Sequence, residues 1–370
     1  MDPVSSNVKK NKVLLAMSGG TDSSVAALLL KDLNCEIEGM TFRSYDSISK
    51  ACMEKESGCC NADSLFEAKK LAESLGFNHQ IIDVRDVFDK TVIENFVNGY
   101  LSGLTPNPCV VCNKTIKWGK MLEEADKLNC RYLATGHYAQ VVFENGRYFL
   151  RQGVDKTKDQ TYFLWTLTQE NLARTIFPLG LLTKTEVREI ARKNNYEKLA
   201  SKRESQEICF IPDDDYRSFL RERVSDIDNK IGHGDFIDTT GKIIGKHKGY
   251  PFYTIGQRKG LEIAMGYPVY VLKIDADNNI ITLGTRDELL SNELVITNIN
   301  LMKYAKIPDN MEAVCKIRYN NQGESCIINQ KDDKIYIRFK NLVSAITPGQ
   351  SAVIYEGDDV VAGGIIVKIS

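Results

Sequence analysis

The sequence predicts an α/β protein in which a doubly wound parallel sheet precedes a small central domain and a C-terminal β-barrel. In the first half, apolar runs alternate with stretches of helical spacing, the order expected of parallel strands joined by helices. The first apolar run ends in a glycine-rich turn that leads straight into a helical segment, and such sheets bind ligands beyond the carboxyl ends of their strands. After Pro268, short strands of alternating polarity dominate, which is typical of a small barrel.

The individual elements follow in order along the chain. In the first half we expect strands at residues 13–17, 37–42, 80–84 and 132–135. We expect helices at 64–75, capped by Asn61 or Asp63, and at 87–100, 114–128 and 183–195. From Pro268 onward we expect barrel strands at 269–274, 280–283, 313–319, 335–339 and 352–355. These elements divide the chain into expected domains at 1–207, 208–270 and 271–370.

Composition narrows the class of protein. The chain has 370 residues, 43% of them hydrophobic and 26% charged, which allows a substantial core and argues against wholesale disorder. A net charge of −1 gives no global sign of nucleic-acid binding, so an RNA site would have to come from local basic patches. Residues 1–12 are polar and the chain has no long apolar run, which predicts a cytoplasmic protein without membrane contact.

The chain contains ten cysteines, and in a reducing compartment this number argues against a structural disulfide framework. Four of them have apolar or strand-like surroundings and are expected to be buried small hydrophobic side chains: Cys35, Cys130, Cys315 and Cys326. Three more are expected to pack or to be incidentally exposed, namely Cys52, Cys59 and Cys60.

The turn after the first strand predicts an anion site. Backbone N–H groups converge where a strand passes through a turn into a helix, and the helix dipole adds about 0.3–1 kcal/mol for a negative charge. Gly19 and Gly20 let the backbone approach an oxygen-rich ligand closely. The serines nearby can add hydroxyl donors, and Asp22 can hold a magnesium ion. A tight turn with a serine or aspartate N-cap would also explain these residues.

The motif in this turn resembles one class of ATP-using enzymes. It has neither the Gly-Lys-Ser/Thr of a Walker motif nor a G-x-G-x-x-G fingerprint. Its S-G-G-x-D-S-S pattern is similar to that of the PP-loop enzymes, which have an adenine nucleotide alpha hydrolase-like fold. The resemblance implies that ATP is split between its α and β phosphates, that an oxygen is adenylated and that pyrophosphate is released.

Two further segments carry cysteines with a distinctive setting. Cys109 and Cys112 follow a loop stiffened by Pro106 and Pro108. We expect Cys112 to lie at or near the N-terminus of the next helix with two lysines close by, and both influences favour the thiolate nucleophile. About a hundred residues later, Cys209 lies in a short polar loop.

The whole chain, beyond any one motif, resembles the MnmA family of tRNA-specific 2-thiouridylases. The matching segments keep their order over nearly the entire length: residues 17–20, 105–108, 112–114, 134–138, 158–164, 256–260 and 347–353. The resemblance implies an ATP site formed by Ala16, Met17, Ser18, Gly19, Gly20, Thr21, Asp22 and Ser23, with Phe42 and Gly136 around the adenosine.

The same resemblance implies a sulfur-transfer mechanism on tRNA. The O2 atom of the wobble uridine would be adenylated, Cys209 would carry a persulfide, and Cys112 would act as the nucleophile. Cys112 would help to release the sulfur onto C2 and form a transient disulfide with Cys209. A cysteine desulfurase or a relay protein would donate the sulfur, and the tRNA acceptors would be of the Lys, Glu and Gln type.

The resemblance also implies that residues 1–207 form the catalytic ATP-binding domain and that the domains at 208–270 and 271–370 bind tRNA. The contacts would be with the anticodon arm, whose bases are already single-stranded and cost little to extrude. His137 lies beside the expected ATP site and would orient the nucleotide or the base. The loop at 256–260 is a candidate basic patch, or simply a basic surface turn. The other matching positions are Asn107, Pro108 and Cys109 beside the target base, and Lys158, Asp159, Gln160, Arg318, Tyr319 and Gln350 on the tRNA.

Cys109 departs from the family pattern, because many members have aspartate there. A thiol is a poorer hydrogen-bond acceptor than a carboxylate, so the role of that aspartate does not carry over. Two uses of the cysteine set stay open. Cys109, Cys112 and Cys209 could ligate a [4Fe-4S] cluster with one iron left open, or a zinc ion. Alternatively, Cys109 is a spare or resolving thiol in persulfide chemistry without a cluster.

Two other classes of function compete with this interpretation. One is a PP-loop synthetase acting on a small molecule, which would need neither the distant cysteines nor a C-terminal barrel. The other is an RNA-binding or sulfur-carrier protein whose ATP site only gates binding.

Overall fold

The computed structural model describes residues 11–45, 62–202, 208–211 and 215–367. Cys52, Cys59, Cys60 and the expected cap Asn61 lie outside these residues. The chain forms two compact units. The first comprises residues 1–92, 109–214 and 358–360, and the second comprises 93–108, 215–357 and 361–370.

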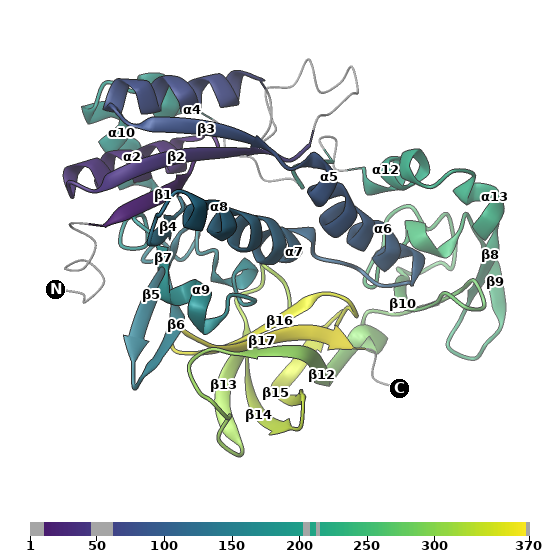
Figure 1. The fold of residues 1–370 in the computed structure, drawn as a ribbon. Helices are drawn as coiled ribbons and strands as arrows, with labels where there is room; N and C mark the ends of the chain where they lie inside the picture. Colours follow the sequence, from purple (N-terminus) through teal and green to yellow (C-terminus); the bar gives the residue numbers. More distant parts are fainter. Residues whose placement is uncertain (1–10, 46–61, 203–207, 212–214, 368–370) are drawn as a thin grey trace. The chain divides into compact units, whose positions relative to one another are not determined.

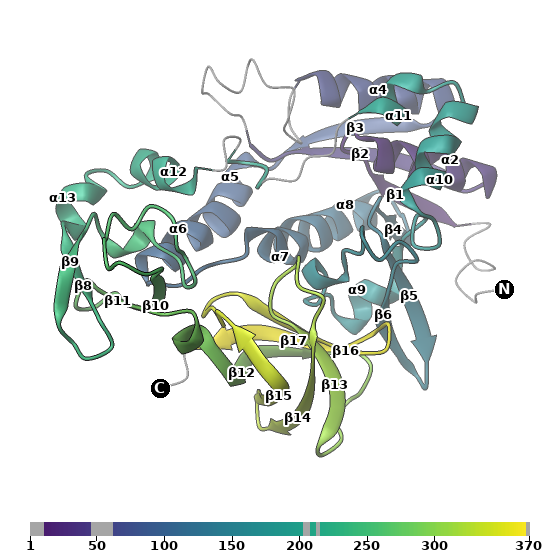
Figure 2. The same ribbon diagram turned by 180° about the vertical axis from the view of Figure 1, so that it is seen from behind.

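The first unit is built on a five-stranded sheet in which every described pairing is parallel. Its strands, in spatial order, are β3 (Asn78–Asp83), β2 (Glu36–Arg43), β1 (Lys12–Ala16), β4 (Tyr132–Ala134) and β7 (Thr175–Ile176). One face is covered by α2 (Thr21–Asp32), α4 (Ala62–Leu75), α10 (Lys184–Lys193) and α11 (Glu197–Ser201), and α8 (Met121–Lys127) covers the other, as Figures 1 and 2 show. The predicted doubly wound sheet is confirmed.

Burial explains why β1 reads as a continuous apolar run. Val13 and Leu15 pack into the core formed with α2, α4 and α10, whereas Leu14 is buried on the opposite face. Strands covered on both faces need no polar alternation. The chain continues to β2 on one side of β1 and to β4 on the other. This reversal of strand order is the place where ligands of open α/β sheets bind.

The helix that carries the first cysteine pair begins earlier than expected. It starts at Pro108 as α7 (Pro108–Cys112), continues as a π-helical stretch, η2 (Asn113–Lys120), and ends as α8. Proline suits the first helical position because its missing N–H would have no partner there. Cys112 therefore lies one turn inside the helix, near its N-terminus, and Cys109 occupies the first turn.

Other helices of the sequence analysis are found with small changes. Residues 87–100 correspond to α5 (Arg85–Phe88), η1 (Asp89–Ile93) and α6 (Glu94–Leu101). The helix expected at 183–195 is α10, and Thr183 and Glu186 cap it reciprocally. The remaining elements of the first unit are a hairpin of β5 (Ala139–Glu144) and β6 (Arg147–Gln152), η3 (Thr161–Phe163) and α9 (Gln169–Ala173).

The second unit contains a four-stranded sheet in the order β10-β11-β8-β9. Its strands are β8 (Gly234–Ile237), β9 (Ile243–His247), β10 (Tyr270–Asp275) and β11 (Ile280–Gly284). β10 and β11 correspond to two strands expected in the barrel, and they belong to this separate sheet instead. β11 pairs in parallel with β8, a long-range crossover that local alternation cannot reveal. Short helices accompany this sheet: α12 (Tyr216–Arg223), α13 (Ile227–Ile231) and η4 (Tyr250–Phe252).

The predicted C-terminal barrel is confirmed as six antiparallel strands. Their spatial order around the barrel is β12 (Leu290–Leu301), β15 (Lys334–Ser344), β14 (Glu324–Lys331), β13 (Met311–Lys316), β16 (Ser351–Glu356) and β17 (Asp359–Val367). In the sequence, η5 (Asp287–Leu289) precedes these strands. β12 also pairs with β17, which closes the sheet and removes its edges. Ile296, Ile328 and Ile337 fill the interior.

Two further expectations concern cysteines and membranes. Cys35, Cys130, Cys315 and Cys326 are all buried, as expected. Burial raises the pKa of Cys130 to about 11 and that of Cys326 to about 12, so these thiols stay protonated at neutral pH. Among the helices of the described residues, none has the length and apolar character needed to span a membrane.

Candidate functional site

The turn between β1 and α2 depends on one glycine. Gly19 has φ +70°, and a Cβ atom added there would lie 2.1 Å from the carbonyl oxygen of Ser64. Gly20 is the N-cap of α2 with φ −89°, and an added Cβ would lie 3.4 Å from Oγ of Ser18. The backbone path therefore requires glycine at position 19 and tolerates a side chain at position 20.

Hydroxyl groups stabilise this turn from within. Oγ of Ser23 accepts a hydrogen bond from the Ser18 amide at 3.2 Å and donates to the Gly20 carbonyl at 3.2 Å. Oγ of Ser24 donates to the same carbonyl at 2.8 Å, and Ser24 is only 3% exposed. In this conformation the Ser24 hydroxyl is thus used within the turn.

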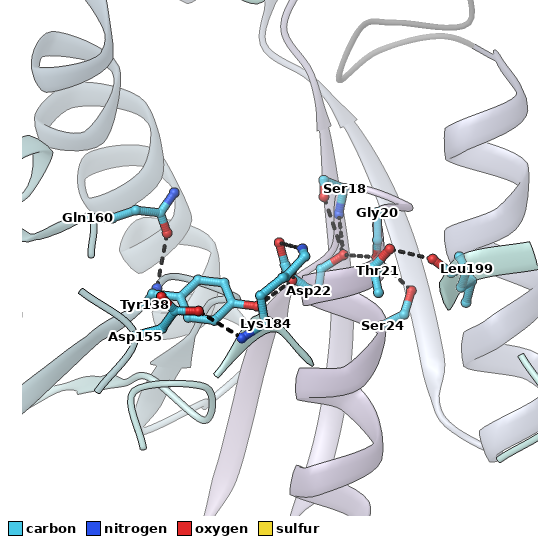
Figure 3. Close-up of polar contacts among 11 residues, drawn as sticks. Ser18, Gly20, Thr21, Asp22, Ser24, Tyr138, Asp155, Gln160, Lys184 and Leu199 are labelled. Carbon is cyan, nitrogen blue, oxygen red and sulfur yellow. Dashed lines mark hydrogen bonds and ion pairs between the residues drawn. The ribbon is translucent and has the colours of Figure 1, made fainter. Parts of the chain in front are cut away.

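The N-terminus of α2 has no side-chain cap. The first amides of a helix have no partner within it, so those of the first turn are available to an anion, as is usual for phosphate sites. Thr21 is held away from them, because its hydroxyl donates to the Leu199 carbonyl (Figure 3).

A charged network lies next to these amides. Lys184 Nζ donates to Asp22 Oδ1 at 2.7 Å and to Oδ2 at 2.9 Å, and the Tyr138 hydroxyl donates to Oδ1 at 2.8 Å. Figure 3 shows Tyr138 and Lys184 meeting at Asp22. Lys184 is only 7% exposed, and it occupies the first turn of α10, where the helix dipole opposes a cation. Asp22 compensates this charge, and the Lys184 amide donates to Asp155 Oδ2 at 3.0 Å.

The loops after β1 and β4 are in direct contact. A Cβ atom added at Gly136 would lie 2.9 Å from the amide nitrogen of Ser23, so only glycine fits. The site therefore lies where the strand order reverses. Of the other expected nucleotide residues, Ala16 ends β1, Met17 follows it, and Phe42 is a buried residue of β2.

His137 lies in the loop after β4 in a neutral state. Burial, and secondly the charge of Lys117, holds the pKa of His137 well below its ordinary value of 6.5. Lys117 Nζ lies 3.4 Å from Nε2, and Thr135 Oγ1 lies 2.7 Å from Nδ1. Since the ammonium can only donate, the ring accepts at Nε2, and Nδ1 donates to the threonine. The imidazole is thus oriented without being charged.

The three candidate thiols all belong to the first unit. Cys109 and Cys209 are exposed, and Cys112 is half-buried. Phe210 anchors the segment of Cys209 by an edge contact with Phe88 at 5.8 Å between ring centroids. Among the described residues, no three His, Cys, Asp or Glu side chains gather closely enough to hold a metal. The thiols as placed do not form a cluster site.

The expected tRNA residues have different environments. Asp159 is 4% exposed and accepts hydrogen bonds from the Gly153 amide and the Thr161 hydroxyl at 3.2 and 2.8 Å. Gln160 accepts one from the Tyr138 amide at 3.0 Å. These two side chains shape their loop, which also contains Lys158. In the second unit, Gln350 donates to the Thr105 carbonyl at 3.2 Å, beside Asn107 and Pro108 in sequence, and Tyr319, next to Arg318, is 36% exposed.

The fold and the loop define an ATP-using enzyme of the PP-loop class. A family model described as the tRNA methyl transferase HUP domain matches residues 11–213. Models described as the tRNA methyl transferase PRC-barrel domain and the aminomethyltransferase beta-barrel domain match residues 217–285 and 291–366.

Relatives give the particular family. The chain is 50% identical to the tRNA-specific 2-thiouridylase MnmA of Amoebophilus asiaticus, over 97% of this chain and 96% of the relative. It is 47% identical to that of Cytophaga hutchinsonii, over 97% and 98%, and 48% identical to that of Salinibacter ruber, over 98% and 95%. The chain belongs to the MnmA family of tRNA-specific 2-thiouridylases.

Sequence reasoning missed the partners of Asp22. Nothing in the local pattern marks Tyr138 or Lys184 as neighbours of a residue more than a hundred positions away. A lysine in the first turn of a helix, against the dipole, is the one sequence signal that could have drawn attention to Lys184.

The contrast between the two glycines is testable. We expect Gly19→Ala to lower the free energy of unfolding by about 1–3 kcal/mol, because the side chain must adopt a left-handed conformation and displace Ser64. Gly20→Ala is the matched control and should change it by less than about 0.5 kcal/mol. Urea unfolding of both variants without ligand measures the difference. Equal stabilities would contradict the assigned turn geometry.

Proposed function

We propose that this protein is an ATP-dependent tRNA 2-thiouridylase that replaces O2 of the wobble uridine by sulfur. The observation that carries the proposal is the PP-loop with open helix amides in a chain that is 50% identical, over nearly its full length, to a tRNA-specific 2-thiouridylase. The central domain and the barrel would bind the tRNA anticodon arm, as the sequence analysis expected.

In this proposal the first turn of α2 holds the phosphates of ATP. Its amides donate to phosphate oxygens, and Gly136 leaves room beside Asp22 and Ser23. ATP supplies the adenylyl group that turns O2 of uracil into a leaving group. Asp22 holds Lys184 beside the loop, so Lys184 is placed to interact with the negative charge that a triphosphate brings.

The magnesium role of Asp22 needs revision on this geometry. Both carboxylate oxygens accept from Lys184, and one also accepts from Tyr138. As placed, this carboxylate is part of an ion pair and not an open oxygen ligand. We therefore assign Asp22 the task of positioning Lys184 and derive no step through a metal at this site.

The sulfur would travel through the thiols. A cysteine desulfurase or relay protein would load Cys209, which is exposed, as a persulfide. Cys112 then attacks the Cys209 sulfur and expels hydrosulfide. The hydrosulfide adds to C2 of the activated uridine, and AMP leaves. Cys112 and Cys209 are left as a disulfide, which an external thiol must reduce with two electrons before the next turnover.

The role of Lys184 gives one prediction. Lys184→Met should slow tRNA-dependent pyrophosphate release about 10²–10³-fold, the range for removing one electrostatic contact to a developing charge. Lys193→Met, the same change in the exposed last turn of α10, is the control and should have little effect. Lys184→Arg should restore part of the rate. A wild-type rate in Lys184→Met would contradict the assignment.

The thiol roles give a second prediction. Cys112→Ser and Cys209→Ser should abolish thiolation from a persulfide donor while ATP affinity stays at the wild-type value. Cys109→Ser should keep activity on the persulfide route, because Cys109 is not part of it.

The cluster alternative has the opposite signature. If Cys109, Cys112 and Cys209 hold a [4Fe-4S] cluster, anaerobically prepared wild-type protein would contain stoichiometric iron and acid-labile sulfide. Cys109→Ser would then lose both the iron and the activity. That result would contradict the persulfide route and support the cluster.

A further inference from the structure

The loop at residues 256–260 borders a shallow pocket in the second unit. The pocket has a volume of about 530 Å³ and lies between this loop and the first turn of α12. Its described lining contains two cations and no acidic side chain: Tyr216, Arg217, Thr254, Ile255, Gly256, Gln257, Lys259 and Gly260. The proposed reaction assigns no role to this pocket.

Arg217 is held in a fixed orientation at the pocket. Its Nε atom donates to the Phe252 carbonyl at 2.8 Å, and its guanidinium lies 5.7 Å from the centroid of the Tyr216 ring. A Cβ atom added at Gly260 would lie 4.0 Å from Nη1 of Arg217, so that nitrogen faces the end of the loop. A guanidinium fixed in this way is suited to a phosphate group.

The loop is shaped by Gln257. Its side-chain amide donates to the Lys259 carbonyl at 2.9 Å and accepts from the Thr254 amide at 3.2 Å. Lys259 itself is exposed. Of the acidic groups that the structure describes nearby, Glu262 pairs with Lys248 at 2.9 Å. Asp215 accepts from Ser218 Oγ at 2.6 Å and also interacts with the charge of Arg217. The lining that the structure describes carries its two cations without a carboxylate of its own.

The other end of the loop reaches the barrel. A Cβ atom added at Gly256 would lie 2.8 Å from Cβ of Ala345 and 3.9 Å from Nη2 of Arg318. Arg318 in turn donates to the Ala345 carbonyl, and Tyr319 beside it is 36% exposed. Arg318 and Arg217 thus lie at opposite ends of the same five-residue loop.

We infer that this pocket binds a backbone phosphate of the RNA substrate through Arg217 and Lys259, next to the contact expected at Arg318 and Tyr319. The inference rests on the proposed function for the identity of the RNA. The pocket is shallow and basic, and a chain of net charge −1 needs such a local patch to attract RNA. Contacts of cations with phosphate specify position along the backbone and not sequence.

The test measures affinity for an unmodified tRNA transcript between about 50 and 200 mM salt, where counterion release dominates. Lys259→Gln and Arg217→Gln should each reduce the slope of log affinity against log salt by about one. Each lost contact corresponds to about eightfold weaker binding at 0.1 M salt, if affinities converge at 1 M. Lys193→Gln, at an exposed lysine in the last turn of α10 in the first unit, is the matched control and should leave both values unchanged.

The outcomes separate this inference from the proposed function. Wild-type slope and affinity in Lys259→Gln and Arg217→Gln, with normal thiolation, would overturn the pocket and leave the function intact. Wild-type protein that binds tRNA but never thiolates it would contradict the function, while the binding slopes would still decide the pocket. Since Arg217 also contacts Phe252, Lys259→Glu serves as a second variant, and its larger loss of affinity should occur without a change in unfolding midpoint.

Discussion

One carboxylate connects the parts of the nucleotide site. Asp22 lies in the first turn of α2, accepts from Tyr138 after β4, and compensates the charge of Lys184 on α10. The Lys184 side chain is 9% exposed, against 34% for Asp22. A lysine this buried, in the first turn of a helix, requires an anion beside it. The spacing between the three segments, and hence the shape of the site at the strand reversal, depends on this contact.

The consequence is a site that is organised before a ligand arrives. Hydroxyl groups that could turn toward a phosphate are used within the loop, because Ser23 and Ser24 both donate to the Gly20 carbonyl. The open donors are backbone amides, which cannot rotate away. A preorganised cation and fixed amides favour charge that develops during reaction, since little reorganisation is needed.

Much of the fold around the nucleotide site can be predicted from local sequence patterns. Apolar runs and turn residues predict β1, the glycine turn and α2. The capping box at Thr183 lies at the start of the helix that the sequence predicts there. The cysteine helix starts earlier than predicted because Pro108, expected in a rigid loop, occupies the first helical position, to which proline is well suited. The hairpin of β5 and β6 was missed despite its Asn145–Gly146 turn, whose positive φ angles of 50° and 75° fit a two-residue hairpin loop.

Contacts between residues far apart in the sequence could not be predicted from local patterns. The ion pair of Asp22 with Lys184 joins residues 162 positions apart, and the parallel pairing of β11 with β8 crosses the intervening chain. Neither leaves a periodic signal. The roles of the thiols remain predictions, because they concern chemistry with partners that local patterns only suggest. The domain boundaries also remain predictions.

The central claim is that the loop after β1 activates O2 of the tRNA uridine by adenylation. The direct measurement uses tRNA whose wobble uridine carries a heavy oxygen isotope at O2, with ATP and a persulfide donor, and determines the mass of the AMP released. The account predicts one heavy oxygen in the AMP for each thiolated uridine. Unlabelled AMP from a reaction that does thiolate the tRNA would contradict it.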